Sequence, residues 1–173
     1  MSLLNKKTKL FNIIALVLVV VIFAFQCIPF WSTDTLLTYA ENKSASAFEE
    51  NTSASISAVI WFPGMNETIR DQIDVALDKN FSLENLATYI ALQHLLSIIF
   101  ILLVIKNMSS PFVSLIALAQ GLLGGLGFFL EPSLRLSTLS IVQPILSFAI
   151  VAVSLVAFVV SFFARKKATA NAN

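Results

Sequence analysis

The side chains with the clearest chemical potential are four polar residues inside long apolar stretches, namely Gln93, His94, Gln120 and Gln143. A polar side chain within a membrane is costly and usually faces the interior of a helix bundle. Because histidine titrates near neutral pH, His94 could be a proton-sensitive or ligand-binding position. The structural alternative is a hydrogen bond between His94 and Gln120 across a helix interface, worth about 0.6 kcal/mol in a membrane. We favour the structural interpretation.

The common sequence patterns of catalytic and metal sites are absent. There is no P-loop, dinucleotide-binding glycine fingerprint or nucleophile elbow, and no pair of carboxylates within an apolar stretch. Cys27 is the only cysteine and His94 the only histidine, which excludes a disulfide within the chain and a zinc site of several histidines. Asp71, Asp74 and Asp78 have the spacing of a solvated helix face. We therefore predict no enzyme activity, no metal and no cofactor.

The composition argues for lipid as the surroundings of most of the chain. Of the 173 residues, 57% are hydrophobic and only 12% are charged, whereas an ordinary soluble domain carries roughly a quarter charged residues. The formal net charge of +1 provides no basic field to hold nucleic acid. We expect a lipid bilayer as the main partner and no nucleic acid.

Four apolar stretches are long enough to cross a bilayer, since twenty helical residues rise about 30 Å. We predict an all-α membrane protein, a bundle of four transmembrane helices at residues 10–31, 84–105, 111–130 and 138–164. The remaining segments are then a tail at 1–9, a large outer loop at 32–83, turns at 106–110 and 131–137, and a second tail at 165–173.

The distribution of charge predicts the orientation of these helices. The two tails and the turn at 106–110 contain seven basic residues and no acidic residue, whereas the loop at 32–83 has a net charge of −5. Lysine and arginine near the ends of spans are retained on the cytoplasmic side. We expect a multi-pass protein of the plasma membrane with both termini in the cytoplasm.

The large outer loop contains patterns of local structure. Residues 55–62, rich in β-branched and aromatic side chains and followed by Pro63-Gly64, predict a strand. Its nearest possible partner is the segment 33–40, which would complete a small antiparallel sheet. Asn66 has the position of a helix N-cap, followed by an amphipathic pattern from Glu67 to about Lys79. We predict a cap made of this sheet and this short helix.

Two groups of residues are candidates for contacts rather than chemistry. The apolar side chains of the predicted cap that could bind a membrane or envelope protein are Trp61, Phe62, Tyr39, Ile69 and Ile73. In the third span, Ala117, Gly121 and Gly125 recur at four-residue spacing, which allows close approach of two helix backbones. The small residues serve packing within the chain or, alternatively, self-association.

The order of these elements resembles the claudin-like four-helix membrane proteins, on the basis of Trp31 after the first span, Trp61 in the loop and the spacing of the spans. Claudins carry two disulfide-bonded cysteines after their loop tryptophan, and none follows Trp61, so the resemblance implies topology only. The sequence also resembles small uncharacterised four-span proteins of Firmicutes. The segments that carry this resemblance are Phe30-Trp31, Ile60-Trp61-Phe62-Pro63, Phe81-Ser82 and residues 127–136. That resemblance implies a bacterial plasma membrane and brings no activity.

Two functional hypotheses follow. The first is a non-catalytic structural, interaction or accessory protein that uses its acidic outer cap. The alternative is a small transporter or channel component whose polar pathway is lined by His94, Gln120 and Gln143.

Overall fold

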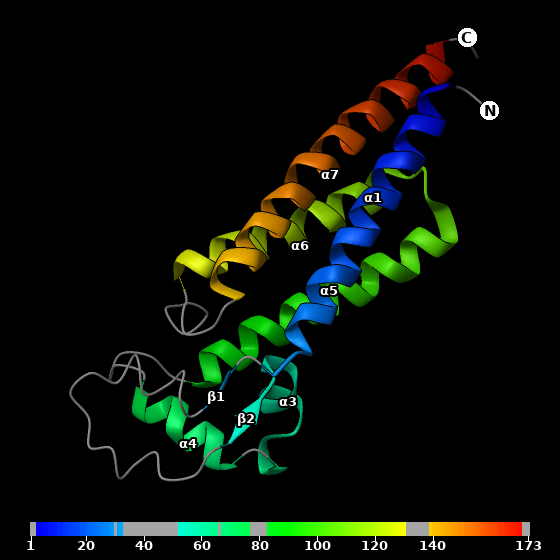
Figure 1. Cartoon of the computed structure of the whole chain (residues 1–173). Helices are drawn as coiled ribbons and strands as arrows, with labels where there is room; N and C mark the ends of the chain where they lie inside the picture. The colour runs from blue at the N-terminus through cyan, green and yellow to red at the C-terminus, as the bar shows by residue number, and fades with distance from the viewer. Residues whose placement is uncertain are drawn as a thin grey trace.

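The computed structural model describes residues 3–29, 31–32, 52–65, 67–76, 83–130 and 139–170. Its long helices are α1 (Leu3–Gln26), α5 (Leu83–Asn107), α6 (Pro111–Leu130) and α7 (Leu139–Ala170). Figure 1 shows the start of α1 and the end of α7 at one end of the molecule, here called the termini end. The short elements lie at the opposite end, here called the cap end.

The long helices alternate in direction. At the turn between α5 and α6, the carbonyl oxygen of Met108 accepts a hydrogen bond from Nδ2 of Asn12 in α1, at 2.8 Å. Ser114 near the start of α6 donates to Oδ1 of the same asparagine at 2.9 Å. These bonds place the α5–α6 turn beside the N-terminal half of α1. Helix α5 therefore runs toward the termini end, α6 returns to the cap end, and α7 runs back.

Three of these helices contain segments that are long and apolar enough to cross a membrane. The segments are Leu4–Gln26, Ala87–Asn107 and Val142–Ala164. In α6, the apolar segment Pro111–Gly127 is shorter. Three such helices are the signature of a multi-pass membrane protein.

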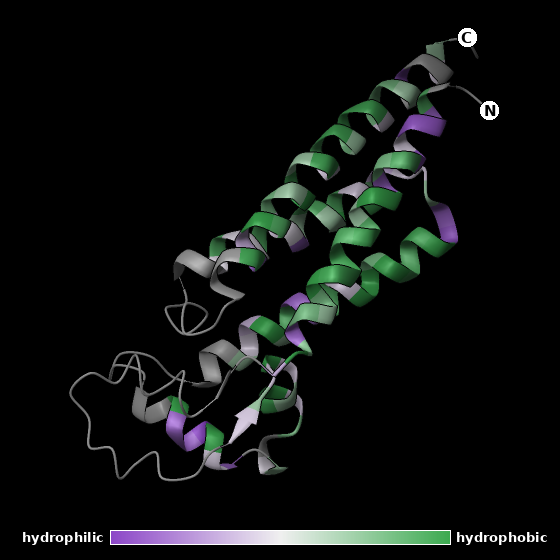
Figure 2. Cartoon of the chain, in the orientation of Figure 1, coloured by the Kyte–Doolittle hydropathy of each residue, from purple (hydrophilic) through white to green (hydrophobic). Residues whose placement is uncertain are grey.

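The burial of side chains is inverted relative to a soluble protein. In α5 the polar Gln93, His94 and Ser97 are buried, whereas Leu95 and Leu102 are exposed, Leu102 by 61%. Figure 2 shows that hydrophobic residues make up most of the length of the long helices. Many large apolar side chains exposed on long helices are the pattern of a multi-pass membrane protein.

An apolar core fills the middle of the bundle. Its buried residues come from all four long helices, among them Ile22 of α1, Phe100 and Val104 of α5, and Ile150 of α7. The complete set of its buried residues is Ala15, Val19, Ile22, Phe100, Val104, Val113, Ala117 and Ile150. This apolar core separates the Asn12 contacts near the termini end from the polar residues nearer the cap end.

The cap consists of short elements from the loop that follows α1. Strand β1 (Trp31–Ser32) pairs in antiparallel fashion with β2 (Ser53–Ala54), with Trp31 opposite Ala54. A short helix α3 (Ile56–Trp61), the 3₁₀ turn η2 (Pro63–Met65) and helix α4 (Glu67–Ala76) follow. The predicted sheet partner at 33–40, the predicted N-cap Asn66 and residues 77–80 lie outside the described residues.

The predicted strand at 55–62 is wrong, because most of this segment is the helix α3. The side chain of Ser55 caps the helix by accepting a hydrogen bond from the backbone N–H of Ala58 at 3.1 Å. Ile56 and Val59, three residues apart, are both buried on one face. Burial at helical spacing therefore outweighs the strand preference of the β-branched side chains.

The other bounds differ modestly from those predicted. Helix α1 begins at Leu3 and ends at Gln26 rather than spanning residues 10–31, because the chain turns at Cys27 and Ile28 before Pro29. Trp31, predicted at the end of the first span, belongs to β1. Helix α6 has the predicted bounds, and α7 extends beyond the predicted end to Ala170.

Candidate functional site

A chain of hydrogen bonds joins α1, α5 and α7 near the cap end. Gln26 Nε2 donates to Oε1 of Gln93 at 2.9 Å and to Oε1 of Gln143 at 3.4 Å. Gln26 Oε1 lies 2.8 Å from Nε2 of His94. All four residues are buried, and we call them the amide cluster. Gln26 is its centre, because it contacts each of the other three.

The hydrogen bonds determine the protonation of His94. The indole Nε1 of Trp61 lies 2.8 Å from Nδ1 of His94 and can only donate. Nδ1 must therefore accept, so Nε2 carries the proton and donates to Oε1 of Gln26. The imidazole is neutral in this arrangement. Its ring also packs between aromatic groups, with the Phe23 centroid at 4.9 Å and the Trp61 centroid at 6.0 Å.

The predicted direct contact between His94 and Gln120 is not formed. Gln120 Nε2 instead donates to the hydroxyl of Ser97 at 3.3 Å. Ser97, one turn after His94 and Gln93, donates in turn to the backbone carbonyl of Gln93 at 2.8 Å. Gln120 is therefore buried against α5, but its partner is Ser97, one helical turn after the predicted partner His94.

Several buried polar atoms in this region have no partner among the described residues. They include Gln93 Nε2, Gln143 Nε2, Gln120 Oε1 and the hydroxyl of Ser147. Gly124 of α6 lies where two of these groups converge, because a Cβ placed there would lie 2.6 Å from Gln93 Nε2 and even closer to the Ser147 hydroxyl. The absence of a side chain at Gly124 thus makes room for two polar groups.

The small residues of α6 face α7. A Cβ at Gly121 would lie 2.9 Å from the backbone oxygen of Ser147, and one at Gly125 would lie 3.0 Å from the ring of Phe148. Ala117 is fully buried in the apolar core. All three residues therefore pack inside this chain, and the two glycines allow α6 to lie close to α7.

The proposed interaction residues of the cap divide into two kinds. Ile69 and Ile73 of α4 are buried inside the cap and are closed to a partner. Trp61 and Phe62 are exposed, by 53% and 60% respectively. Tyr39 lies outside the described residues. Of the two exposed candidates, Trp61 is joined to the helix bundle by its hydrogen bond to His94, and Phe62 is the next residue along the chain.

Sequence reasoning missed two buried polar residues that form hydrogen bonds to other helices or turns, namely Gln26 of the amide cluster and Asn12 near the termini end. Both lie near the ends of the first apolar stretch, where a polar residue is easily assigned to the membrane boundary. The sequence feature that could have identified them is the one used for Gln93, a side-chain amide within a stretch of large apolar residues. In the structure both are buried.

The amide cluster is suited to holding helices together. Its four residues carry neutral side chains, and its hydrogen bonds connect no nucleophile to a base. In the part of the chain that the structure describes, no three residues among His, Cys, Asp and Glu are grouped so as to hold a metal ion. What the cluster offers chemically is buried hydrogen-bond donors and acceptors.

The fold and the network define a helical protein of the multi-pass membrane class. No family model matches the chain, and neither the curated proteins nor the solved structures contain a match to it.

Proposed function

We propose that the chain is a non-catalytic protein of the plasma membrane with four spans and cytoplasmic termini, whose acidic cap binds a membrane or envelope protein. The observation that carries this proposal is the attachment of the cap to the bundle. Trp61 of α3 is bonded to His94 of α5, and His94 is bonded to Gln26 of α1. A cap held at a fixed position is a suitable platform for a partner.

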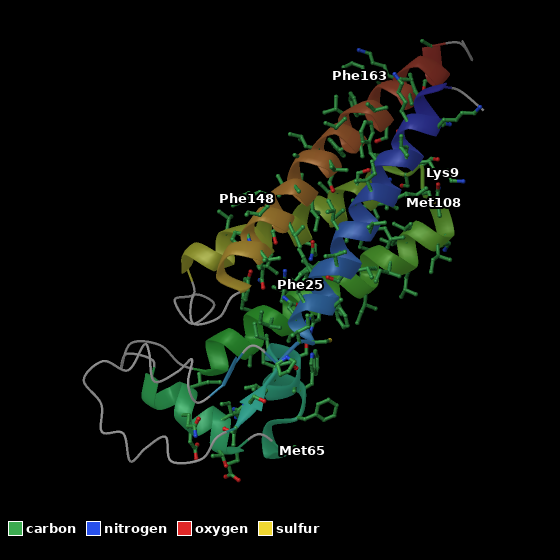
Figure 3. All side chains as sticks on the ribbon, in the orientation of Figure 1. Lys9, Phe25, Met65, Met108, Phe148 and Phe163 are labelled. Carbon is green, nitrogen blue, oxygen red and sulfur yellow. The ribbon has the colours of Figure 1, made fainter. Side chains whose placement is uncertain are left out.

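The path of the chain supports four spans. Helix α6 returns from the termini end to the cap end, and its twenty residues rise about 30 Å. Charge supports the orientation, because the exposed lysines Lys6, Lys7 and Lys9 of α1 lie at the termini end together with Lys106 and Lys166. Figure 3 labels Lys9 close to Met108, at the α5–α6 turn. Basic residues at that end favour its retention in the cytoplasm.

Within the cap, α4 offers the surface best suited to a protein partner. Ile69, Gln72 and Ile73 form its buried face. Glu67, Thr68 and Asp71 are exposed, and the loop that contains them has a net charge of −5. Complementary charge favours a partner with a basic surface and speeds its encounter with the cap. Helix α4 is joined to α3 by a hydrogen bond, because Arg70 donates to the carbonyl oxygen of Val59 at 2.9 Å.

A photoreactive residue placed at Thr68 in native membranes is expected to form an adduct with one partner. The same residue at Asn107, exposed at the opposite end, serves as the matched control. The Thr68 adduct should weaken strongly when Glu67 and Asp71 are both changed to lysine, because charge reversal repels a basic surface. An adduct indifferent to this reversal, or the same adduct from Asn107, would contradict the proposal.

The alternative function is a small transporter or channel component, and one observation favours it. Gln93 Nε2, Gln143 Nε2 and the Ser147 hydroxyl are buried and unpartnered among the described residues, as groups along a polar pathway would be. Against it, the apolar core lies between these groups and Asn12 near the termini end. Passage would require the helices around Phe100 to separate.

The alternative is tested by flux measurements on the purified chain in liposomes, for protons, ions and small solutes. A pathway through the amide cluster predicts flux above that of empty liposomes and its loss in His94→Leu. The circular dichroism of both forms establishes that they fold alike. If neither form conducts, the transporter hypothesis is rejected.

A further inference from the structure

We propose that the Trp61–Phe62 edge of the cap inserts into the outer leaflet of the lipid bilayer, so that α3 is an interfacial helix rather than part of a water-facing domain. The proposal rests on the membrane-spanning arrangement inferred above but is independent of any protein partner. The partner surface lies on α4, whereas this edge lies on the short helix next to α1 and α5 (Figure 1).

The depth of Trp61 is the first argument. Its hydrogen-bond partner His94 lies seven residues after Ala87, where the apolar segment of α5 begins, or about 10 Å along the helix. His94 also contacts Phe23, which precedes the end of the α1 segment at Gln26. Trp61 therefore lies beside the last turn of the α1 segment and about two turns inside the start of the α5 segment, and not beyond either of them.

Exposure at this depth is the second argument. Trp61 and Phe62 are more than half exposed, and Ile28, after the end of α1, is also exposed. The exposed side chains Phe23 and Val20 continue this apolar surface along α1. Since the outer surface of α1 is covered by lipid, the same lipid reaches the cap edge that adjoins it.

The chemistry of the segment is the third argument. The outer loop is strongly acidic, yet residues 51–66 contain no charged residue at all. A side chain that enters the acyl region at a cost close to zero must be uncharged, because charge within a membrane is expensive. The indole N–H of Trp61 is already bonded to His94, so the polar group of the ring is satisfied and its apolar body can enter the lipid. Tryptophan is the residue most typical of this zone.

The test uses the full-length chain in phosphatidylcholine vesicles, in which flotation with the vesicles first establishes insertion. Trp31→Phe leaves Trp61 as the only tryptophan. Its fluorescence is measured with lipids brominated near the glycerol end or near the methyl end of the acyl chain, and with iodide in the water. We expect the fluorescence of Trp61 to be quenched most strongly by bromine near the glycerol end of the acyl chain. We expect iodide in the water to quench it little.

Met65 supplies the matched control. It is exposed, and Figure 3 labels it at the tip of the cap, away from the long helices. A tryptophan introduced as Met65→Trp, with Trp31→Phe and Trp61→Phe, should be quenched by iodide and little affected by brominated lipid.

Two results would overturn the proposal. Strong iodide quenching of Trp61 without lipid quenching would mean that this edge faces water in the absence of a protein partner. Strongest quenching by bromine near the methyl end would place the ring deep in the hydrocarbon. Neither result bears on the Thr68 adduct, so failure of this inference and failure of the proposed function are distinguishable.

Discussion

Gly121→Leu is expected to lower the free energy of unfolding by about 3 kcal/mol, at the upper end of the usual cost of overpacking. A Cβ at Gly121 already lies 2.9 Å from the backbone oxygen of Ser147 and 3.0 Å from Cγ2 of Ile150. A backbone atom cannot rotate away, so α6 and α7 must separate. Unfolding of the purified chain in mixed micelles by increasing SDS, followed by circular dichroism, measures the effect.

The control for this substitution is Gly64→Leu in η2. No heavy atom lies within 4 Å of a Cβ placed at Gly64, so the change in unfolding free energy should stay within about 0.5 kcal/mol. Gly121→Ala should fall between the two, since it adds the Cβ alone. Equal stability of Gly121→Leu and Gly64→Leu would show that α6 and α7 do not pack as described.

Gln26→Leu is expected to destabilise the protein by about 2 kcal/mol, the cost of leaving buried polar groups unpaired. Leucine fills a similar volume but removes the acceptor of His94 Nε2 and the donor to Oε1 of both Gln93 and Gln143. The same titration with SDS applies. Because Gln26 holds the His94 ring through its Nε2 in the orientation that lets Nδ1 accept from Trp61, the cap should also become more sensitive to protease.

Gln143→Leu is the informative comparison for Gln26→Leu. It removes one hydrogen bond of 3.4 Å and also removes a buried Nε2 that has no partner among the described residues. These two effects oppose each other, so its stability should stay near that of the natural chain, within about 0.5 kcal/mol. If Gln143→Leu costs as much as Gln26→Leu, then Gln26 is not the centre of the network.

The long helices could be predicted because a single property, continuous hydrophobicity over about twenty residues, decides them. The segment 111–130 became α6 without a change of bounds. The cap was harder, because residues 55–62 satisfy the residue preferences of a strand and the burial spacing of a helix at once. Packing of Ile56 and Val59 decides between these, and packing depends on partners distant in the sequence.

Most of the polar residues of the candidate site could be predicted from the sequence, but the hydrogen bonds between them could not. Burial of Gln93, His94, Gln120 and Gln143 follows from the cost of polar groups in lipid. Which amide meets which depends on the rotation and offset of each helix, to which the hydrophobic pattern is insensitive. An offset of one turn is enough to give Gln120 the hydroxyl of Ser97 in place of His94.

The apolar core has an electrical consequence. Phe100, Val104, Ile22 and Ile150 belong to the apolar core in the middle of the bundle, and the buried hydroxyl of Ser154, one turn after Ile150, has no partner among the described residues. Moving an elementary charge across a membrane potential of 100 mV involves about 2.3 kcal/mol of electrical work, and an ion that entered this layer would also lose most of its hydration. The liposome measurement of proton and ion flux therefore tests this apolar layer directly.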